Sequence, residues 1–292
     1  MRNKIAVVVR TYNNEEILGK TLKAIQSQKK VDLEIYVIDS GSNDRTVEIA
    51  SLYTNEIFHL VSMKYHPGKV LNKIIPEIEC ENIVFVNSDT VLLREDSLYN
   101  LLEDMENPFI AASYGRQECR PDAWPEVRRA YKKTFPESNN TAEWITLSLP
   151  LACIKKSIWM KRKFYVDSWG SEDTEWGKYI ESQGYYIKYN FKAVAMHSHN
   201  YDIRQLYNRS FVEGEADHYI YDRSVSYTTF IRKVIGKSIR DCCVCFSEYA
   251  IRHGVSTLFR SFVSELGYLM GVRNAYARVL VGNKNVPMKS YQ

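Results

Sequence analysis

The stretch IVFVNSDTVLL, residues 83–93, indicates the fold more clearly than any other part of the chain. Four apolar residues run directly into the polar triplet Asn87-Ser88-Asp89, and apolar character resumes at Val91. A short apolar run of this kind is typical of a buried strand. Polar groups at the end of a buried strand are costly unless they bind a partner. The triplet therefore predicts a binding site, and its single carboxylate, Asp89, limits what it can bind.

The same pattern recurs in the segments before the triplet. Apolar runs predict strands at 4–10, 33–38 and 56–61, and residues with helical spacing predict helices near 17–25, 46–53 and 69–78. Alternating strands and helices, with nearly continuous apolar strands, predict a parallel sheet covered on both faces. Ligands of such sheets bind at the carboxyl ends of the strands. Asp39 and the triplet both follow strand ends, so we expect them to share one crevice.

The remaining patterns are less regular. We expect helices at 96–106, 124–134 and 202–220, a strand at 109–117, and another helix that begins around Glu172-Asp173. The run before His197-Ser198-His199 predicts one strand or two. Two further helices are expected at 229–252 and 257–280, and a frayed tail after them. The sequence thus divides into an α/β domain over 1–223 and C-terminal basic amphipathic helices over 224–292.

Composition and charge narrow the class of protein. The chain of 292 residues shows no signal peptide and no apolar run near the roughly 18 residues of a membrane span. The spacing of its six Cys suggests no disulfide framework, which favours a reducing cytoplasm. Residues 224–292 hold ten Lys or Arg against three Asp or Glu, a net +7, so the total of +4 leaves −3 for residues 1–223. This basic segment predicts either a peripheral membrane contact or a solvated helix face, and no nucleic-acid motif accompanies it.

The acidic residues at the strand ends suggest metal-assisted chemistry. A divalent ion held between Asp89 and a diphosphate would use hard oxygen ligands, and a His could complete the shell of a Mn²⁺-like ion. Because His197 and His199 alternate on a predicted strand, we expect at most one of them to face the ion. A separate carboxylate could remove a proton from a hydroxyl. Two simpler interpretations stay open: Asp39 caps a turn, and the acids of the Glu172-Asp173 pair complement a helix dipole.

Six segments together resemble family 2 glycosyltransferases of GT-A fold, over about residues 4–220. The last segment resembles the one that follows the Glu-Asp motif in bacterial rhamnosyltransferase-like members of that family. The segments are VVVRTYNNEEIL (7–18), VIDSGSNDRTVEIA (37–50), KVLNKII (69–75), VNSDT (86–90), GSEDTEWGKYIESQGY (170–185) and MHSHNYDIRQLYNRSFVEGEA (196–216). The order of the segments matches the family, although Leu71 stands where the family usually has Arg.

The resemblance implies a role for each matched residue. Asp173 would be the catalytic base, and Asp89 and His197 would bind the metal ion, Mn²⁺ or Mg²⁺. Asn87 replaces the first carboxylate of the family's DxD motif and would contact the ribose or the sugar. The nucleotide-sugar would be bound by Thr11, Tyr12, Asn13, Glu15, Asp39, Lys69, Asn72, Asn87, Ser88 and Glu172. In these terms residues 1–90 form a nucleotide-binding half and residues 91–223 an acceptor-side half.

The implied activity is a single inverting displacement. A hydroxyl of a saccharide or lipid-linked saccharide acceptor would attack a nucleotide-diphosphate sugar, with rhamnose or another deoxyhexose as the candidate sugar. The setting would be cell-surface polysaccharide synthesis in the cytoplasm or on the inner face of the cytoplasmic membrane. Two alternatives remain, a family 2 transferase with a UDP-hexose donor and a non-catalytic nucleotide-sugar-binding protein. A dinucleotide oxidoreductase is disfavoured, because no GxGxxG follows the first strand.

Overall fold

A computed structural model describes residues 4–60, 66–139, 142, 144–166, 170–247 and 251–280. Within them, one sheet of eight strands has the order β3-β2-β1-β4-β7-β6-β8-β5. Its strands are β1 (Ile5–Thr11), β2 (Leu33–Asp39), β3 (Ile57–His59), β4 (Asn82–Asn87), β5 (Val91–Leu92), β6 (Ile110–Glu118), β7 (Leu151–Lys155) and β8 (Tyr186–Met196). The pairs among β1 to β4 and the pair β6–β8 are parallel, whereas β7 and β5 run antiparallel to their neighbours. The predicted α/β class with a mostly parallel sheet is confirmed.

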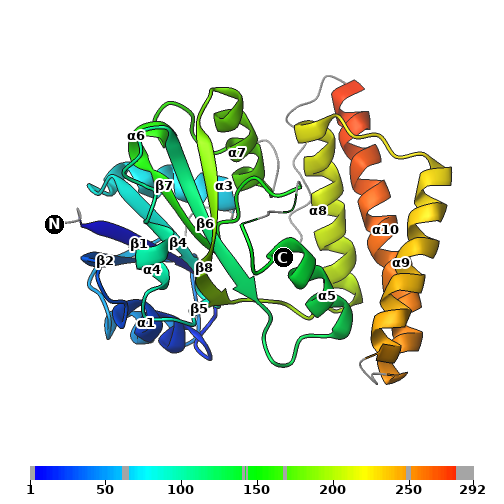
Figure 1. Ribbon diagram of the computed structural model, residues 1–292, viewed down its shortest axis with the longest axis horizontal. Helices are drawn as coiled ribbons and strands as arrows, with labels where there is room; N and C mark the ends of the chain where they lie inside the picture. Colours follow the sequence, from blue (N-terminus) through cyan, green and yellow to red (C-terminus); the bar gives the residue numbers. More distant parts are fainter. Residues whose placement is uncertain are drawn as a thin grey trace.

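Helices cover both faces of this sheet (Figure 1). They are α1 (Leu18–Gln26), α2 (Thr46–Ser51), α3 (Pro67–Ile74), the 3-10 turn η1 (Ile75–Glu77), α4 (Ser97–Leu101), α5 (Pro125–Thr134), α6 (Lys156–Trp159), α7 (Glu172–Ser182), α8 (Ile203–Tyr221), α9 (Tyr227–Ser247) and α10 (Ile251–Leu280). Successive side chains of β1 alternate between the faces. Val7 packs with α1 and α4 in one apolar cluster, and Val8 packs with α3 and α7 in the other.

Two details differ from the sequence prediction, and the sequence leaves a third open. The helix expected at 96–106 is short, because α4 ends at Leu101 and turns follow it. The run before His197 forms a single long strand, β8, with register irregularities opposite β6. The two-residue strand β5 is not predicted, since two apolar residues carry no periodicity. Its antiparallel pairing with β8 aligns Val91 with Met196, and this pairing matters for the site.

The C-terminal helices form a layer beside the sheet, in the order α8, α10, α9 (Figure 1). Glycines allow α8 and α10 to approach closely. A Cβ on Gly271 would lie 2.0 Å from the carbonyl oxygen of Phe211, and one on Gly214 would lie 2.2 Å from that of Tyr268. No side chain larger than hydrogen fits at such a distance. The predicted helix at 229–252 reaches residues 248–250 and the predicted tail lies after 280, and both of these parts are outside the described residues.

No helix within the described ranges combines the length and the apolar character that crossing a membrane requires. The predicted boundary at 223 falls in the connection between α8 and α9. The packing of α10 against α8 makes the C-terminal helices continuous with the rest of the molecule. The division into two domains at this boundary therefore stays a prediction.

Candidate functional site

Strand register gathers the predicted polar residues at one edge of the sheet. Thr11 pairs with Asp39 across β1 and β2, and Arg10 pairs with Asn87 across β1 and β4, so the three strands end at the same level. A turn after Asn87 then leads into β5, whose pairing with β8 carries the chain back past the end of that strand. Asp89 therefore lies beside the residues that follow Met196.

Three side chains meet there in an arrangement suited to a metal ion. His199 Nε2 lies 3.2 Å from His197 Nε2 and 3.3 Å from Asp89 Oδ2, and His197 Nε2 lies 3.7 Å from Asp89 Oδ1. Donor atoms that share one ion at bond lengths of about 2.0–2.2 Å have separations of this order. Two imidazoles and one carboxylate on one side of an ion form a known type of divalent-metal site with open positions. The residues present thus fit a divalent ion.

The expectation that only one His can face the ion is wrong. Side-chain alternation applies only within a strand. Strand β8 ends at Met196, so His197 and His199 lie in the irregular segment after it. Both side chains turn toward Asp89, and their rings meet edge to face with centroids 4.9 Å apart.

A second residue fixes the orientation of His197. Its Nδ1 lies 2.9 Å from Gln117 Oε1, an atom that only accepts hydrogen bonds, so Nδ1 carries the proton and Nε2 keeps its lone pair. Gln117 Nε2 in turn donates to Ser148 Oγ at 2.8 Å. Outer hydrogen bonds of this kind orient metal-ligating histidines. Burial lowers the pKa of His197 to about 4, against the opposing effect of Asp89, so the ring is neutral at pH 7.

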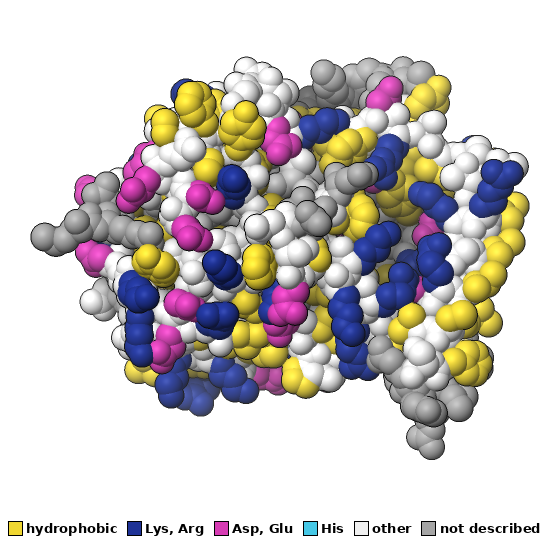
Figure 2. All heavy atoms as spheres, viewed as in Figure 1, with side chains coloured by type: hydrophobic (Ala, Val, Ile, Leu, Met, Phe, Trp, Pro, Cys, Tyr) yellow, Lys and Arg dark blue, Asp and Glu magenta, His cyan; other side chains and the backbone are white. Residues whose placement is uncertain are grey.

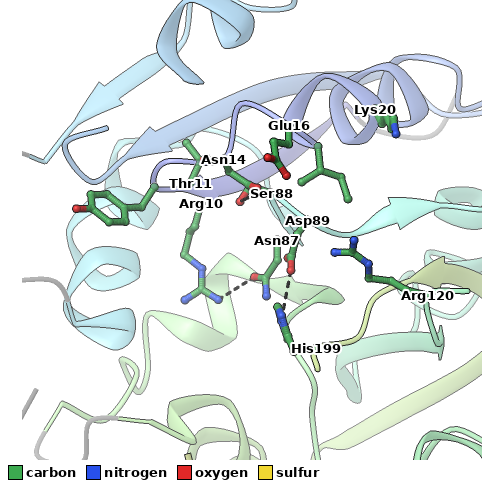
Figure 3. Close-up of a pocket in the computed structure, with 12 residues that line it drawn as sticks. Arg10, Thr11, Asn14, Glu16, Lys20, Asn87, Ser88, Asp89, Arg120 and His199 are labelled. Carbon is green, nitrogen blue, oxygen red and sulfur yellow. Dashed lines mark hydrogen bonds and ion pairs between the residues drawn. The ribbon is translucent and has the colours of Figure 1, made fainter. Parts of the chain in front are cut away.

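A pocket of about 620 Å³ opens next to this cluster (Figure 3). We call it the strand-end pocket. Its lining residues are Arg10, Thr11, Tyr12, Asn14, Glu16, Ile17, Lys20, Asn87, Ser88, Asp89, Arg120 and His199. The hydroxyl oxygen of Thr11 is buried without a hydrogen-bond partner among the described residues, although a buried hydroxyl normally has one. Three cations and one unsatisfied polar group suit this pocket to an anionic, polar ligand.

Arg10 connects the pocket to the carboxylates of α7. Its guanidinium donates to Asn87 Oδ1 at 3.1 Å and lies 3.5 Å from Glu172 Oε1 (Figure 3). Burial raises the pKa of Glu172 to about 7, with the adjacent Asp173 adding to the effect and Arg10 opposing it. Glu172 thus lies behind the pocket and holds Arg10, instead of lining the pocket itself.

Two predicted binding residues of the first loop hold that loop in place. Asn13, which has a left-handed backbone with φ of 45°, accepts a hydrogen bond from the Asn43 amide at 2.8 Å. Glu15 Oε2 accepts from the Arg45 amide at 2.9 Å. These bonds attach the loop after β1 to the loop after β2. The neighbouring Asn14 donates to Ser88 Oγ at 2.6 Å and so joins the loop to the triplet.

Three other predicted residues do not line the strand-end pocket. The buried carboxylate of Asp39 accepts hydrogen bonds from the Gly41 and Ser42 amides and from Ser42 Oγ, which is the turn cap that the sequence left open. Both amide atoms of Asn72 bond to the backbone of Phe164. Lys69 is exposed on α3. Their predicted contacts with a nucleotide remain predictions.

Asp173 lies in the first turn of α7 and does not line the strand-end pocket. The Leu149 amide donates to its Oδ2 at 3.2 Å, and its side chain is only partly buried. Arg209 of α8, which pairs with Glu213 at 2.7 Å, is within electrostatic range of Asp173 as well as of His197 and His199.

Four contributing residues are absent from the sequence prediction. Arg10 continues an apolar run, and the sequence pattern assigns it only to a strand. Arg120 and Gln117 lie outside the six matched segments, whereas Arg10 and Arg209 lie within two of them, 7–18 and 196–216, without being assigned a role. The only sequence signal for them is their closeness to the ends of strands or to His199.

The first comparison with known proteins concerns the family. The model of the family described as glycosyl transferase family 2 matches residues 6–170, more than half of the chain. The chain belongs to this family, and it is a glycosyltransferase.

Two relatives and one solved structure are also similar to this chain. The O-antigen chain rhamnosyltransferase RfbN of Salmonella typhimurium is 30% identical over 224 residues, which cover 72% of this chain and 71% of the relative. The O-antigen chain rhamnosyltransferase WbaN of Salmonella anatum is 28% identical over 223 residues, or 71% and 70% of the two chains. The mannosyltransferase PcManGT of Pyrobaculum calidifontis, solved with GDP-Man and Mn²⁺, superposes with a TM-score of 0.60 at 16% identity, over 98% of this chain and 81% of that one. The predicted GT-A fold is confirmed.

Proposed function

We propose that this glycosyltransferase moves a sugar from a nucleotide-diphosphate sugar to a saccharide acceptor by one inverting displacement that depends on a divalent metal ion. The observation that carries the proposal is the meeting of Asp89, His197 and His199 at the wall of the strand-end pocket. This pocket would bind the nucleotide and its diphosphate. Arg10 and Arg120 line it and supply positive charge near the leaving group.

In this mechanism Asp173 is the general base. Its carboxylate would take the proton of the acceptor hydroxyl as that oxygen attacks the anomeric carbon and the diphosphate leaves. Arg209 adds positive charge within electrostatic range of Asp173. No covalent intermediate with the protein is needed. Glu172 contributes indirectly, because its contact with Arg10 positions that cation behind the leaving group.

Asp89, His197 and His199 would hold the metal ion. When bound, the ion would neutralise charge that develops on the leaving diphosphate. Imidazole ligands are commoner on transition metals than on Mg²⁺, which prefers oxygen. We therefore propose Mn²⁺ in preference to Mg²⁺. The solved mannosyltransferase with a similar fold contains Mn²⁺, which supports this choice.

For the donor we propose a nucleotide-activated rhamnose or a related deoxyhexose, since both Salmonella relatives are named rhamnosyltransferases. A UDP-hexose donor is the alternative within the family. A relative of Campylobacter jejuni that is 24% identical over 65% of this chain is named a glucosyltransferase of an undecaprenol-linked saccharide. That name supports a lipid-linked acceptor.

The test of catalysis replaces the proposed base. Asp173→Asn should lower sugar transfer about 10³-fold, because general bases typically contribute two to four powers of ten, while the affinity for the donor stays within about twofold. Glu181→Gln, which alters an exposed carboxylate on the same helix, is the matched control. Donor hydrolysis and transfer would be followed by chromatography of dTDP-, GDP- and UDP-sugars with Mn²⁺. Full activity of Asp173→Asn would exclude this base, and donor binding without turnover in the wild type would favour the non-catalytic alternative.

We also propose that the outer face of α9 contacts the inner face of the cytoplasmic membrane. The apolar stripe predicted in this helix is exposed instead of packed: the exposed fractions are 54% for Ile231, 55% for Ile235, 59% for Ile239 and 64% for Phe246. The residues of α9 that are buried include Ser238 and Asp241. Hydrophobic side chains run along the right-hand edge of the molecule over α9, with Lys and Arg side chains beside them (Figure 2). This pattern suits a helix that lies in an anionic interface.

A vesicle experiment tests this contact. Ile235→Glu should reduce cosedimentation with vesicles of phosphatidylglycerol and phosphatidylcholine about tenfold, because it places a charge in the apolar stripe. Leu52→Glu makes the same change at a residue that is 77% exposed on the opposite part of the molecule, and it should have no effect. Equal loss in both variants, or no binding by the wild type, would contradict the membrane contact.

A further inference from the structure

A second cavity, of about 230 Å³, lies between the α/β part and the C-terminal helices. We call it the helix-lined cavity. Helices α5, α8, α9 and α10 contribute to its wall, together with the segment after β8. His199 lines this cavity and also the strand-end pocket. The two spaces therefore meet at one of the three metal-binding side chains.

The wall of the helix-lined cavity combines ion pairs with aromatic rings. Arg129 of α5 pairs with the buried Asp241 of α9. Arg260 of α10 lies 3.1 Å from Glu126 of α5 and donates to the Tyr201 carbonyl at 2.9 Å. These pairs hold α9 and α10 against α5, so the C-terminal helices determine the shape of the cavity.

Each of these two ion pairs leaves one buried polar atom unsatisfied. Glu126 Oε2 and Arg129 Nε have no hydrogen-bond partner among the described residues. Buried polar atoms without partners are rare and costly, and a bound ligand or water usually explains them. One is an acceptor and the other a donor, and a hydroxyl group can satisfy either kind.

Aromatic and apolar side chains form the rest of the wall. Tyr131 and Tyr201 provide rings, and Val127 and Leu206 provide aliphatic surface. The Tyr201 ring stacks on His199 with centroids 5.4 Å apart and an interplanar angle of 19°. A sugar ring has an apolar face that packs on such side chains and hydroxyl groups that bond to charged ones. At about 230 Å³ the cavity is smaller than the roughly 300 Å³ of the smallest drug-sized sites, so it suits one sugar ring.

We propose that the helix-lined cavity binds the terminal sugar ring of the saccharide acceptor, with Glu126 and Arg129 as hydroxyl-binding residues and Tyr131 and Tyr201 as ring contacts. This inference rests on the proposed function, and it assigns acceptor recognition to the C-terminal helices. A ring in this position reaches the metal-binding cluster past His199. Arg209 is within electrostatic range of both Tyr201, which lines the cavity, and Asp173, the proposed base.

The test places a large side chain in the cavity and leaves the donor-binding pocket unchanged. Ala130 lines the cavity on α5 and is exposed, so Ala130→Trp should fold and should obstruct the cavity. Lys132→Trp, at an exposed position of the same helix outside the cavity lining, is the matched control. The probes are p-nitrophenyl glycosides of rhamnose, mannose, galactose and glucose. Their binding is measured by saturation-transfer NMR, and their use as acceptors by the KM and kcat of transfer.

We expect Ala130→Trp to lower acceptor kcat/KM at least tenfold and to abolish glycoside binding. Donor hydrolysis by water and the donor-dependent thermal shift should stay unchanged, and the control should match the wild type. Tyr131→Phe, which removes only a hydroxyl and keeps the ring contact, should leave the acceptor KM unchanged. The inference is overturned if no glycoside binds the wild type, if Ala130→Trp transfers normally, or if the control loses as much. A wild type that neither binds nor hydrolyses any donor would instead overturn the proposed function.

Discussion

The strand-end pocket and the helix-lined cavity share His199 but are built differently. Loops that follow parallel strands form the first, and Arg10, Lys20 and Arg120 line it. Packed helices form the second, and ion pairs join those helices. The first suits a charged ligand with a long polar chain, and the second a neutral ring. On the proposed function, the charged donor and the neutral acceptor ring would bind in separate spaces and meet at the metal-binding cluster.

The largest effect should come from the shared cluster. Asp89→Ala removes the only carboxylate among the three metal-binding side chains, so we expect transfer and donor hydrolysis to fall about 10³-fold together. Asp104→Ala changes an exposed acidic residue elsewhere in the chain, and this variant should retain full activity. Both variants would be assayed over a Mn²⁺ titration. Unchanged metal-dependent activity in Asp89→Ala would mean that the triplet is not a metal site.

The next effect concerns the packing of α10 against α8 within the layer of C-terminal helices. Gly271→Ala introduces a Cβ 2.0 Å from the Phe211 carbonyl oxygen, so α10 must move away from α8 and the free energy of unfolding should fall by about 1–3 kcal/mol. Gly254→Ala on the same helix meets nothing within 4 Å and should raise it by about 0.5–1 kcal/mol. Urea denaturation measures both. Changes of the same sign in the two variants would show that the close packing of α8 and α10 contributes little to the free energy of unfolding.

A pH-dependent effect concerns the carboxyl group behind the strand-end pocket. The pKa of Glu172 is raised to about 7 in the folded state, so the folded protein holds this proton more tightly than the unfolded chain does. The resulting stabilisation is present at low pH and is lost as pH rises from about 4.5 to about 7, by at most about 3 kcal/mol. Glu172→Gln should flatten this part of the stability profile, measured by urea denaturation at pH 5, 6, 7 and 8. Parallel profiles for the two proteins would contradict the assignment.

The sequence predicts the strand-end pocket better than the helix-lined cavity, for a physical reason. Parallel strands place their carboxyl ends at one edge, so a polar residue at the end of an apolar run, such as Asp89 or Thr11, is located by local pattern alone. The prediction that only one of His197 and His199 faces the ion is wrong because side-chain alternation assumes that a strand continues, whereas β8 ends at Met196. Asn72 and Asp39 match a motif, but their side chains bond to the protein's own backbone.

The cavity depends on contacts that no local pattern contains. Arg129 and Asp241 are 112 residues apart in the chain, and Glu126 and Arg260 are 134 residues apart. Helical periodicity did locate α9, yet it could not tell which face is exposed. The sequence left a peripheral membrane contact and a solvated helix face both open, and the structure has Ile231, Ile235 and Ile239 exposed. Which face of α9 is exposed depends on the tertiary fit of α10 between α8 and α9.

The central claim is that a metal ion held by Asp89, His197 and His199 binds a nucleotide-sugar in the strand-end pocket. The most direct measurement is the thermal unfolding of the wild type and of Asp89→Ala with dTDP-, GDP- and UDP-sugars, each with and without Mn²⁺. A ligand that binds only the folded state raises the melting temperature. The account predicts an increase for the wild type with at least one donor and Mn²⁺ together, and none for Asp89→Ala. No increase with any donor, or an equal increase in the variant, would contradict it.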